Sequence, residues 1–308
     1  MILSSATLKQ ANQGFNVLFS KGAAAAVPIY PKIAMVVPSS GSQVVYPMWN
    51  QLPGMREWVG PRKAQNLVPS NYTIINKDFE ETIAVQRNDF DDDNLGIYAP
   101  LIQGMGSQAM MHRDILVYNQ LAGAFSTGVY KCFDGKAMCA SNHTLGTRTF
   151  SNVGSAVLSA SAFGTALAAL FSAFDDKSNF YSIPTKFYLC VAPSNIGTAW
   201  EICKGGIVAQ VFGSNTAAAG KDNAWQGVAE PVTIPLLELH PTYWFVVAEY
   251  AGLKPIILQV RKEPEFIALN NPDDPNVFYN KEYTYGVDDR KNVGWGPFTL
   301  IYGSTGGA

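Results

Sequence analysis

The longest hydrophobic pattern in the chain has the spacing of an α-helix and starts at Leu95. Apolar residues recur at positions 95, 98, 102, 105 and 109, and again at 115, 116, 121 and 125. Steps of three and four residues place these side chains on one face of a helix. Pro100 conflicts with an unbroken helix, but it fits the first turn or a kink after a short opening turn. The pattern therefore predicts a long amphipathic helix from about Leu95.

A second helical pattern lies in an uncharged stretch, residues 153–174, that is long enough to cross a bilayer. Its large side chains stand at positions 163, 167, 170, 171 and 174, which is one face of a helix. A membrane span would be apolar on all sides. We therefore expect an amphipathic helix over 159–174 and no membrane association.

The residues after Ser70 alternate as in a β-strand, with Phe79, Ile83 and Val85 on one face and polar residues on the other. Turn-forming glycine and proline at positions 60, 61 and 69 precede this strand, so a long two-stranded hairpin is expected. Before it, residues 23–47 contain four prolines, which favour an extended arm that lies on another surface rather than a regular core.

Charged residues make up 15% of the chain, well below the roughly 25% of an average soluble protein. Buried subunit contacts differ from free surface by such a depletion of charge. We therefore expect an obligate assembly. The net charge is −2 and there is no run of Lys or Arg, so direct nucleic-acid binding is not expected.

The four cysteines form no CxxC pair, and buried reduced thiols of a cytosolic product are expected. Cys132, Cys139 and His143 have a spacing that leaves zinc binding or nucleophilic catalysis open, although zinc favours a closer pair and a fourth ligand. A GxGxxA string at 104–109 lies inside the helical pattern and indicates close helix packing, not a dinucleotide site. No catalytic residue, cofactor-binding residue or metal ligand is predicted.

An acidic cluster, Asp89 with Asp91, Asp92 and Asp93, precedes the long helical pattern. It lacks the glycine and the distant glutamate of a calcium-binding loop. Carboxylates at a helix start accept hydrogen bonds from free N–H groups and oppose the helix dipole. We therefore predict that Asp91, Asp92 and Asp93 cap the long helix.

Five segments together resemble the Mu-like phage major head subunit (major capsid protein) family over nearly the whole chain. They read "REWVG", "NYTIINKDFE", "VQRNDFDDDNLGIYAPL", "FDG…CASNH" and "NVGWGPFTLIYG". The chain departs from the family at Ala137, Met138 and Cys139, where relatives have an aromatic-rich segment.

The resemblance implies an α+β fold, the Hong Kong 97 phage-type capsid fold. In this fold an N-terminal arm and an E-loop hairpin precede a peripheral domain, which holds a long spine helix, and an axial domain. The corresponding ranges are 1–48 for the arm, 49–88 for the E-loop hairpin, 89–158 with 256–308 for the peripheral domain, and 159–255 for the axial domain.

The implied function is that of a major capsid protein, which assembles into pentamers and hexamers of an icosahedral head in the virion. The head would enclose double-stranded DNA without sequence-specific binding. Scaffold or protease and portal proteins, and assembly in the host bacterial cytoplasm, are implied as well. The alternatives are an encapsulin-like compartment shell and an enzyme that uses the cysteines and His143. A hairpin alone is marginal in water, so Trp58, with Arg56 and Arg62 near it, is predicted to contact a neighbouring subunit.

Overall fold

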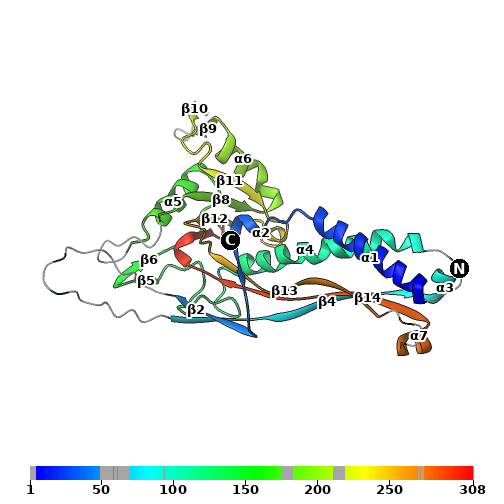
Figure 1. Ribbon diagram of the computed structural model, residues 1–308. Coiled ribbons are helices and arrows are strands. Elements are labelled where there is room, and N and C mark those ends of the chain that lie inside the picture. The colour runs from blue at the N-terminus through cyan, green and yellow to red at the C-terminus, as the bar shows by residue number, and fades with distance from the viewer. Residues whose placement is uncertain are drawn as a thin grey trace.

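A long helix and two β-sheets organise the chain (Figure 1). The computed structural model describes residues 5–48, 58, 61, 70–92, 95–174, 183–210, 219–269, 271 and 274–307. One sheet has four strands and runs under the long helix, and the other has five strands and forms the upper body in Figure 1. The N-terminal end lies at the tip of the limb that the long helix and the four-stranded sheet form.

The long helix is α4 (Ala99–Ala122), and its predicted apolar face is buried. It begins later than expected, because a short helix, α3 (Arg87–Asp91), and a 3-10 turn, η1 (Leu95–Ile97), come before it. Pro100 lies in the first turn of α4, where its missing N–H has no intrahelical partner to lose. The sequence therefore predicts the helix and the place of Pro100, but not the separate turn before them.

The four-stranded sheet has the order β1-β13-β14-β4, in which β1 runs parallel to β13 and the other pairs are antiparallel. Helix α1 (Ser5–Ala25) packs against α4 over this sheet (Figure 1). Phe15 and Phe19 of α1, Ile102 of α4 and Tyr285 of β14 meet in one buried cluster. The strands are β1 (Ala34–Pro38), β4 (Lys77–Gln86), β13 (Ile256–Leu269) and β14 (Glu282–Trp295).

Two glycines let the backbones of α1 and α4 approach closely. A Cβ atom on Gly106 would lie 2.1 Å from the carbonyl oxygen of Phe19, and one on Gly22 would lie 1.9 Å from that of Gln103. Both distances are far below van der Waals contact, so no side chain fits at either position. The expectation of close helix packing at the GxGxxA string is confirmed at Gly106, whereas Gly104 has open space around its Cα atom.

The proline-bearing arm enters the core of the chain itself. Buried Asp114 of α4 accepts hydrogen bonds from the backbone N–H groups of Ile29 and Tyr30, at 3.0–3.1 Å and 2.6 Å. These bonds hold the short helix α2 (Tyr30–Ile33), after which β1 joins the sheet. The expectation that the whole segment lies outside a regular core was therefore wrong, because nonlocal pairing with β13 supplies the hydrogen bonds of β1.

The five-stranded sheet has the order β11-β8-β12-β15-β7 and separates two cores. Leu189 and Val191 of β8 pack with α5 (Ala160–Phe171) and α6 (Ile196–Lys204), whereas Cys190 faces the cluster that contains Val117 of α4. Because both faces are covered, β12 is a continuous buried run and does not alternate. The strands are β7 (Val153–Gly154), β8 (Lys186–Val191), β11 (Ala229–Thr233), β12 (Trp244–Glu249) and β15 (Ile301–Ser304).

Helix α5 confirms the amphipathic interpretation of the uncharged stretch. The side-chain oxygen of Ser159 caps it by accepting a hydrogen bond from the N–H of Ala162 at 3.1 Å. Phe163, Leu167 and Leu170 are buried on one face. Among the residues that the structure describes, no helix is both long and apolar enough to cross a bilayer.

The two-stranded hairpin predicted from the sequence is formed by other strands than the alternating one after Ser70. Strand β2 (Gln43–Met48) pairs antiparallel with β3 (Ser70–Ile75), and the alternating strand β4 pairs with β14 instead. The remaining elements are β5 (His143–Leu145) with β6 (Arg148–Phe150), β9 (Ile207–Gln210) with β10 (Ala219–Asp222), α7 (Pro275–Asn280), and the 3-10 turns η2 (Pro193–Asn195), η3 (Pro235–Leu239) and η4 (Phe298–Leu300).

Candidate assembly surfaces

The predicted capping residues lie before the turn that separates them from the long helix. Asp91 ends α3, exposed Asp92 follows it, and Asp93 lies outside the described residues. The N-cap residue of α4 is Tyr98, whose side chain makes no capping hydrogen bond. The prediction that Asp91 and Asp92 cap the long helix is therefore wrong, because η1 intervenes and Pro100 fixes a later start.

Asp89 is the acidic residue that stabilises a helix start here. It lies in the first turn of α3, where its charge opposes the positive end of the helix dipole. Its carboxylate also accepts a hydrogen bond from the hydroxyl of Tyr98 at 2.5 Å. Asp89 therefore ties α3 to the residue from which α4 begins.

Of the predicted contact residues, Trp58 is the one that the structure describes. Trp58 is 70% exposed, and Arg56 and Arg62 lie outside the described residues. The base of the hairpin is fixed, since Gln259 of β13 accepts a hydrogen bond from the hydroxyl of Tyr46 at 2.9 Å and donates one to the carbonyl of Ile74 at 3.2 Å. The paired strands of the hairpin are thus anchored on the four-stranded sheet.

The cysteines and His143 form a buried structural cluster and not a reactive one. Cys132, Cys139 and His143 are each at most 3% exposed, and all four cysteines of the chain are free thiols. Burial raises the pKa of the Cys132 and Cys139 thiols, so neither is a thiolate near neutral pH. Among the residues that the structure describes, no three His, Cys, Asp or Glu side chains gather as a metal site.

His143 instead ties a loop together. Its Nδ1 lies 2.6 Å from the carboxylate of Asp134, and its Nε2 lies 3.1 Å from the carbonyl oxygen of Met138. The ring stacks on Phe298, with centroids 4.1 Å apart. Burial alone would raise the pKa of Asp134, but the hydrogen bond and charge of His143 hold it below its ordinary value. The cluster therefore stabilises the fold.

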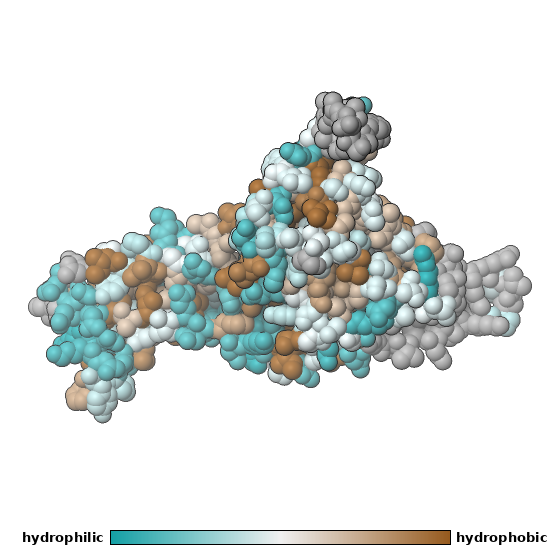
Figure 2. Space-filling view, turned by 180° about the vertical axis from the view of Figure 1, so that it is seen from behind, coloured by the Kyte–Doolittle hydropathy of each residue, from teal (hydrophilic) through white to brown (hydrophobic). Residues whose placement is uncertain are grey.

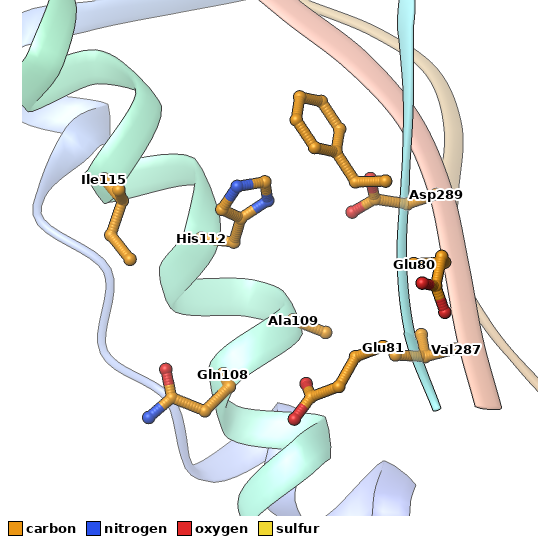
Figure 3. Close-up of a pocket in the computed structure, with 9 residues that line it drawn as sticks. Glu80, Glu81, Gln108, Ala109, His112, Ile115, Val287 and Asp289 are labelled. Atoms are coloured by element: carbon orange, nitrogen blue, oxygen red, sulfur yellow. The ribbon is translucent and has the colours of Figure 1, made fainter. Parts of the chain in front are cut away.

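A groove of about 530 Å³ lies between α4 and the strands β4 and β14 of the four-stranded sheet. Figure 3 shows side chains of α4 and of β4 and β14 facing each other across it. The ring of His112 contacts the ring of Phe79 edge to face, with centroids 4.6 Å apart. The groove is lined by Phe79, Glu80, Glu81, Gln108, Ala109, His112, Ile115, Val287 and Asp289.

The groove is acidic. Asp289 forms an ion pair with the fully buried Lys291, so the exposed carboxylates of Glu80 and Glu81 dominate its charge. Burial and the charge of Lys291 lower the pKa of His112, so this ring adds no positive charge near neutral pH. Glu80 and Glu81 are adjacent in a strand whose apolar and polar residues otherwise alternate. This break in the alternation is the sequence signal that could have indicated that β4 is an edge strand of its sheet.

Apolar side chains also reach the surface. Figure 2 shows them, in brown, between hydrophilic ones on the limb and on the upper body. Phe278 and Tyr279 of α7 are 79% and 78% exposed, and Trp200 of α6 is 53% exposed. Such side chains on a charge-poor subunit are typical of surfaces that become buried by association.

The model of the Mu-like prophage major head subunit gpT matches residues 8–180 and 238–307 of this chain. The chain belongs to this family. It is a structural protein that forms the shell of a phage head, and it is not an enzyme. The family resemblance that the sequence indicated is thereby confirmed, and the enzyme alternative is excluded.

Two curated relatives align over most of the chain. The Mu-like prophage FluMu major head subunit of Haemophilus influenzae is 27% identical over 95% of this chain and 71% of its own length. The major capsid protein of Escherichia phage Mu is 28% identical over 96% of this chain and 72% of its own length. Both relatives are thus longer than this chain.

Solved structures share the fold. A subunit of the bacteriophage JBD30 procapsid superposes with a TM-score of 0.57 at 27% identity, over 98% of this chain and 76% of that one. A virus-like particle from Pyrococcus furiosus gives a TM-score of 0.50 at 10% identity, over 95% of this chain and 98% of that one, which shows the fold alone. The fold is that of Hong Kong 97-type phage capsids, and the subunit acts in an assembled shell of the virion.

Proposed function

We propose that the head consists of pentamers and hexamers in which the β2–β3 hairpin of each subunit packs on a neighbour. The five-stranded sheet with α5 and α6 is the axial domain at the capsomer centre. The four-stranded sheet with α1 and α4 is the peripheral domain, and α4 is its spine helix. The domain ranges expected from the sequence stay a prediction. This proposal assigns β1 and β4 to the peripheral unit and β15 to the axial unit, because of the sheets in which these strands pair.

The exposed indole of Trp58 carries this proposal. A two-stranded hairpin is marginal in water, so its outer end needs a surface to pack on. Tryptophan is enriched at the centres of protein interfaces. Burying its side chain removes about 150–250 Å² from water, which is worth at most about 4–6 kcal/mol before ordering costs. A closed shell repeats this contact in every subunit.

Trp58→Lys tests the proposal. The variant subunit should remain soluble and folded, because Trp58 is exposed in the single subunit, but it should form no shells. Sedimentation and electron microscopy measure assembly, and circular dichroism of the unassembled fraction measures folding. The matched control is Trp58→Phe, which keeps an aromatic ring and should still assemble.

Two results would count against Trp58 as an assembly anchor. Normal shells from Trp58→Lys would show that its contact is not needed. An unfolded, insoluble variant would place the side chain in the core of its own subunit.

The head is further proposed to enclose double-stranded DNA without sequence-specific contacts, which fits a net charge of −2 and the lack of basic runs. Scaffold or protease and portal proteins, and assembly in the host bacterial cytoplasm, follow from the family resemblance. An encapsulin-like compartment shell is the second candidate for this fold. Electron microscopy of native particles distinguishes the two by their content, nucleic acid or an enzyme.

A further inference from the structure

The acidic groups of the groove beside α4 are spread along it. Strand β4 pairs antiparallel with β14, and Phe79 of β4 lies opposite Asp289 of β14. Glu81, two residues further along β4, is therefore a diagonal neighbour of Asp289 on the same face of the sheet, and their backbones lie about 7–8 Å apart. Figure 3 shows the two carboxylates at different positions along α4. A ligand that meets both of them has to be elongated.

Asp289 is the buried acidic residue of the groove, and one of its oxygens can still accept a hydrogen bond. Its side chain is 6% exposed, and Oδ2 accepts a hydrogen bond from Nζ of Lys291. Among the residues that the structure describes, no group donates a hydrogen bond to Oδ1. Such a buried acceptor has lost its hydration without a replacement, so a donor that reaches it from the groove gains a favourable hydrogen bond.

Uncharged side chains line the groove beside the two carboxylates. Ala109 and Val287 are buried and give it an apolar floor. Burial and the charge of Lys291 lower the pKa of His112, so this ring is neutral near neutral pH. A neutral imidazole has one nitrogen that accepts a hydrogen bond. The groove thus offers hydrogen-bond acceptors at two places and an apolar surface beside them.

We infer that this groove binds a linear alkyldiamine, a dication with an ammonium group at each end of about four methylene groups, which suits the spacing of the two carboxylates. One ammonium group donates hydrogen bonds to Oδ1 of Asp289 and to a ring nitrogen of His112. The other ammonium group pairs with Glu81, and the methylene groups cover Ala109 and Val287. The ligand thereby joins α4 to the sheet.

The charges of the groove favour a diamine over a metal ion. Lys291 offsets the charge of Asp289, so the net attraction comes from Glu81 and the adjacent Glu80. A magnesium ion needs oxygen ligands that converge on one point, and it keeps several of its waters. Among the described residues, no three acidic, His or Cys side chains converge in this way. The methylene groups of a diamine also remove the apolar floor from water, which a hydrated ion does not.

Calorimetric titration of putrescine, a diamine of this length, into the unassembled subunit tests the inference. The unaltered subunit should bind it saturably. Glu81→Gln should lower the affinity at least about fivefold, because one ammonium group loses its charged partner at the solvent-exposed rim. Glu81 is exposed, so this variant should fold, and Glu201→Gln at an exposed position of α6 is the matched control with unchanged binding. Lack of saturable binding to the unaltered subunit, or equal affinity of Glu81→Gln, would overturn the inference.

Two other ligands test the chemistry without altering the protein. Butylamine has the same alkyl chain but a single ammonium group, so it should bind at least about fivefold more weakly than putrescine. Magnesium chloride at matched ionic strength should not displace putrescine, because the groove presents no convergent set of oxygen ligands among the described residues. Equal binding of butylamine, or displacement by magnesium at the concentrations at which putrescine binds, would show that the groove attracts any cation and would reject the diamine site.

Thermal unfolding locates the ligand on the subunit. A ligand that binds the folded state alone raises the melting temperature with its concentration. Putrescine should therefore raise the melting temperature of the unaltered subunit, and it should raise that of Glu81→Gln less at the same concentration. Trp58→Lys should respond like the unaltered subunit, because the site does not involve the hairpin contact. A rise of equal size in Glu81→Gln would place the diamine elsewhere and contradict the inference.

Discussion

Burial determines whether the cysteines and His143 of this subunit are reactive or structural. The spacing of Cys132, Cys139 and His143 leaves metal binding and nucleophilic chemistry open, because spacing says nothing about solvent access. In the fold these residues surround a loop whose carboxylate, Asp134, is 6% exposed at its side chain. Desolvation makes the thiols unreactive, and the same desolvation makes the pair between Asp134 and His143 costly to break.

Asp134→Asn should destabilise the subunit by about 1.5–3 kcal/mol, because the buried ring of His143 loses its hydrogen bond to a carboxylate. The folded-state pKa of Asp134 lies below its unfolded value, so its stabilisation is present above about pH 4 and is lost as pH falls through the folded-state pKa. The variant should therefore lack this part of the acid dependence.

Urea unfolding of the unassembled subunit at several pH values measures both effects. Asp92→Asn is the control, since this exposed carboxylate should matter by less than about 0.5 kcal/mol. Equal stability of Asp134→Asn and the unaltered chain at pH 7 would show that the pair contributes nothing.

The contact between α1 and α4 shows how elements join in the limb. Gly106→Ala should destabilise the subunit by about 1–3 kcal/mol, because the new Cβ would meet backbone atoms of Phe19 and Ala23 at 2.1 and 2.9 Å. Gly104→Ala on the same helix is the matched control. It meets no atom within 4 Å and should stabilise α4 by up to about 1 kcal/mol.

Thermal unfolding measures the stability of both variants, and limited proteolysis reports whether α1 stays bound. A stable Gly106→Ala variant with a protected α1 would contradict the close approach of the two helices.

Sequence patterns predict the elements of this subunit better than their ends and pairings. The apolar faces of α4 and α5 follow local periodicity, and Gly106 stood out because small residues in a helix favour close packing. The cap of α4 could not be predicted, because the 3-10 turn η1 and Pro100 jointly shift its start. The partner of β4 could not be predicted either, because an alternating strand shows its buried face but not its neighbour.

At the scale of the whole molecule, the low charge content and the exposed apolar side chains both indicate a subunit that assembles with others. Charged residues make up 15% of the chain, and exposed apolar side chains occur on both the limb and the upper body. When a surface patch of one subunit contacts a different patch of the next, the contact is heterologous, or head-to-tail. Such a head-to-tail contact closes into rings when its rotation allows, as a shell of capsomers requires.

Finally, the shell should be held by non-covalent contacts alone. A bond between a lysine amine and a carboxyl or amide group needs a neutral amine beside its target. Lys77 is exposed to water and lies on no buried carboxyl or amide group of the residues that the structure describes, and fully buried Lys291 already pairs with Asp289 of its own strand. Mature particles boiled in denaturant should run as single subunits, and their intact mass should show no loss of water or ammonia. A ladder of covalent oligomers under reducing conditions would contradict this, and peptide mapping would then identify the lysine that reacts.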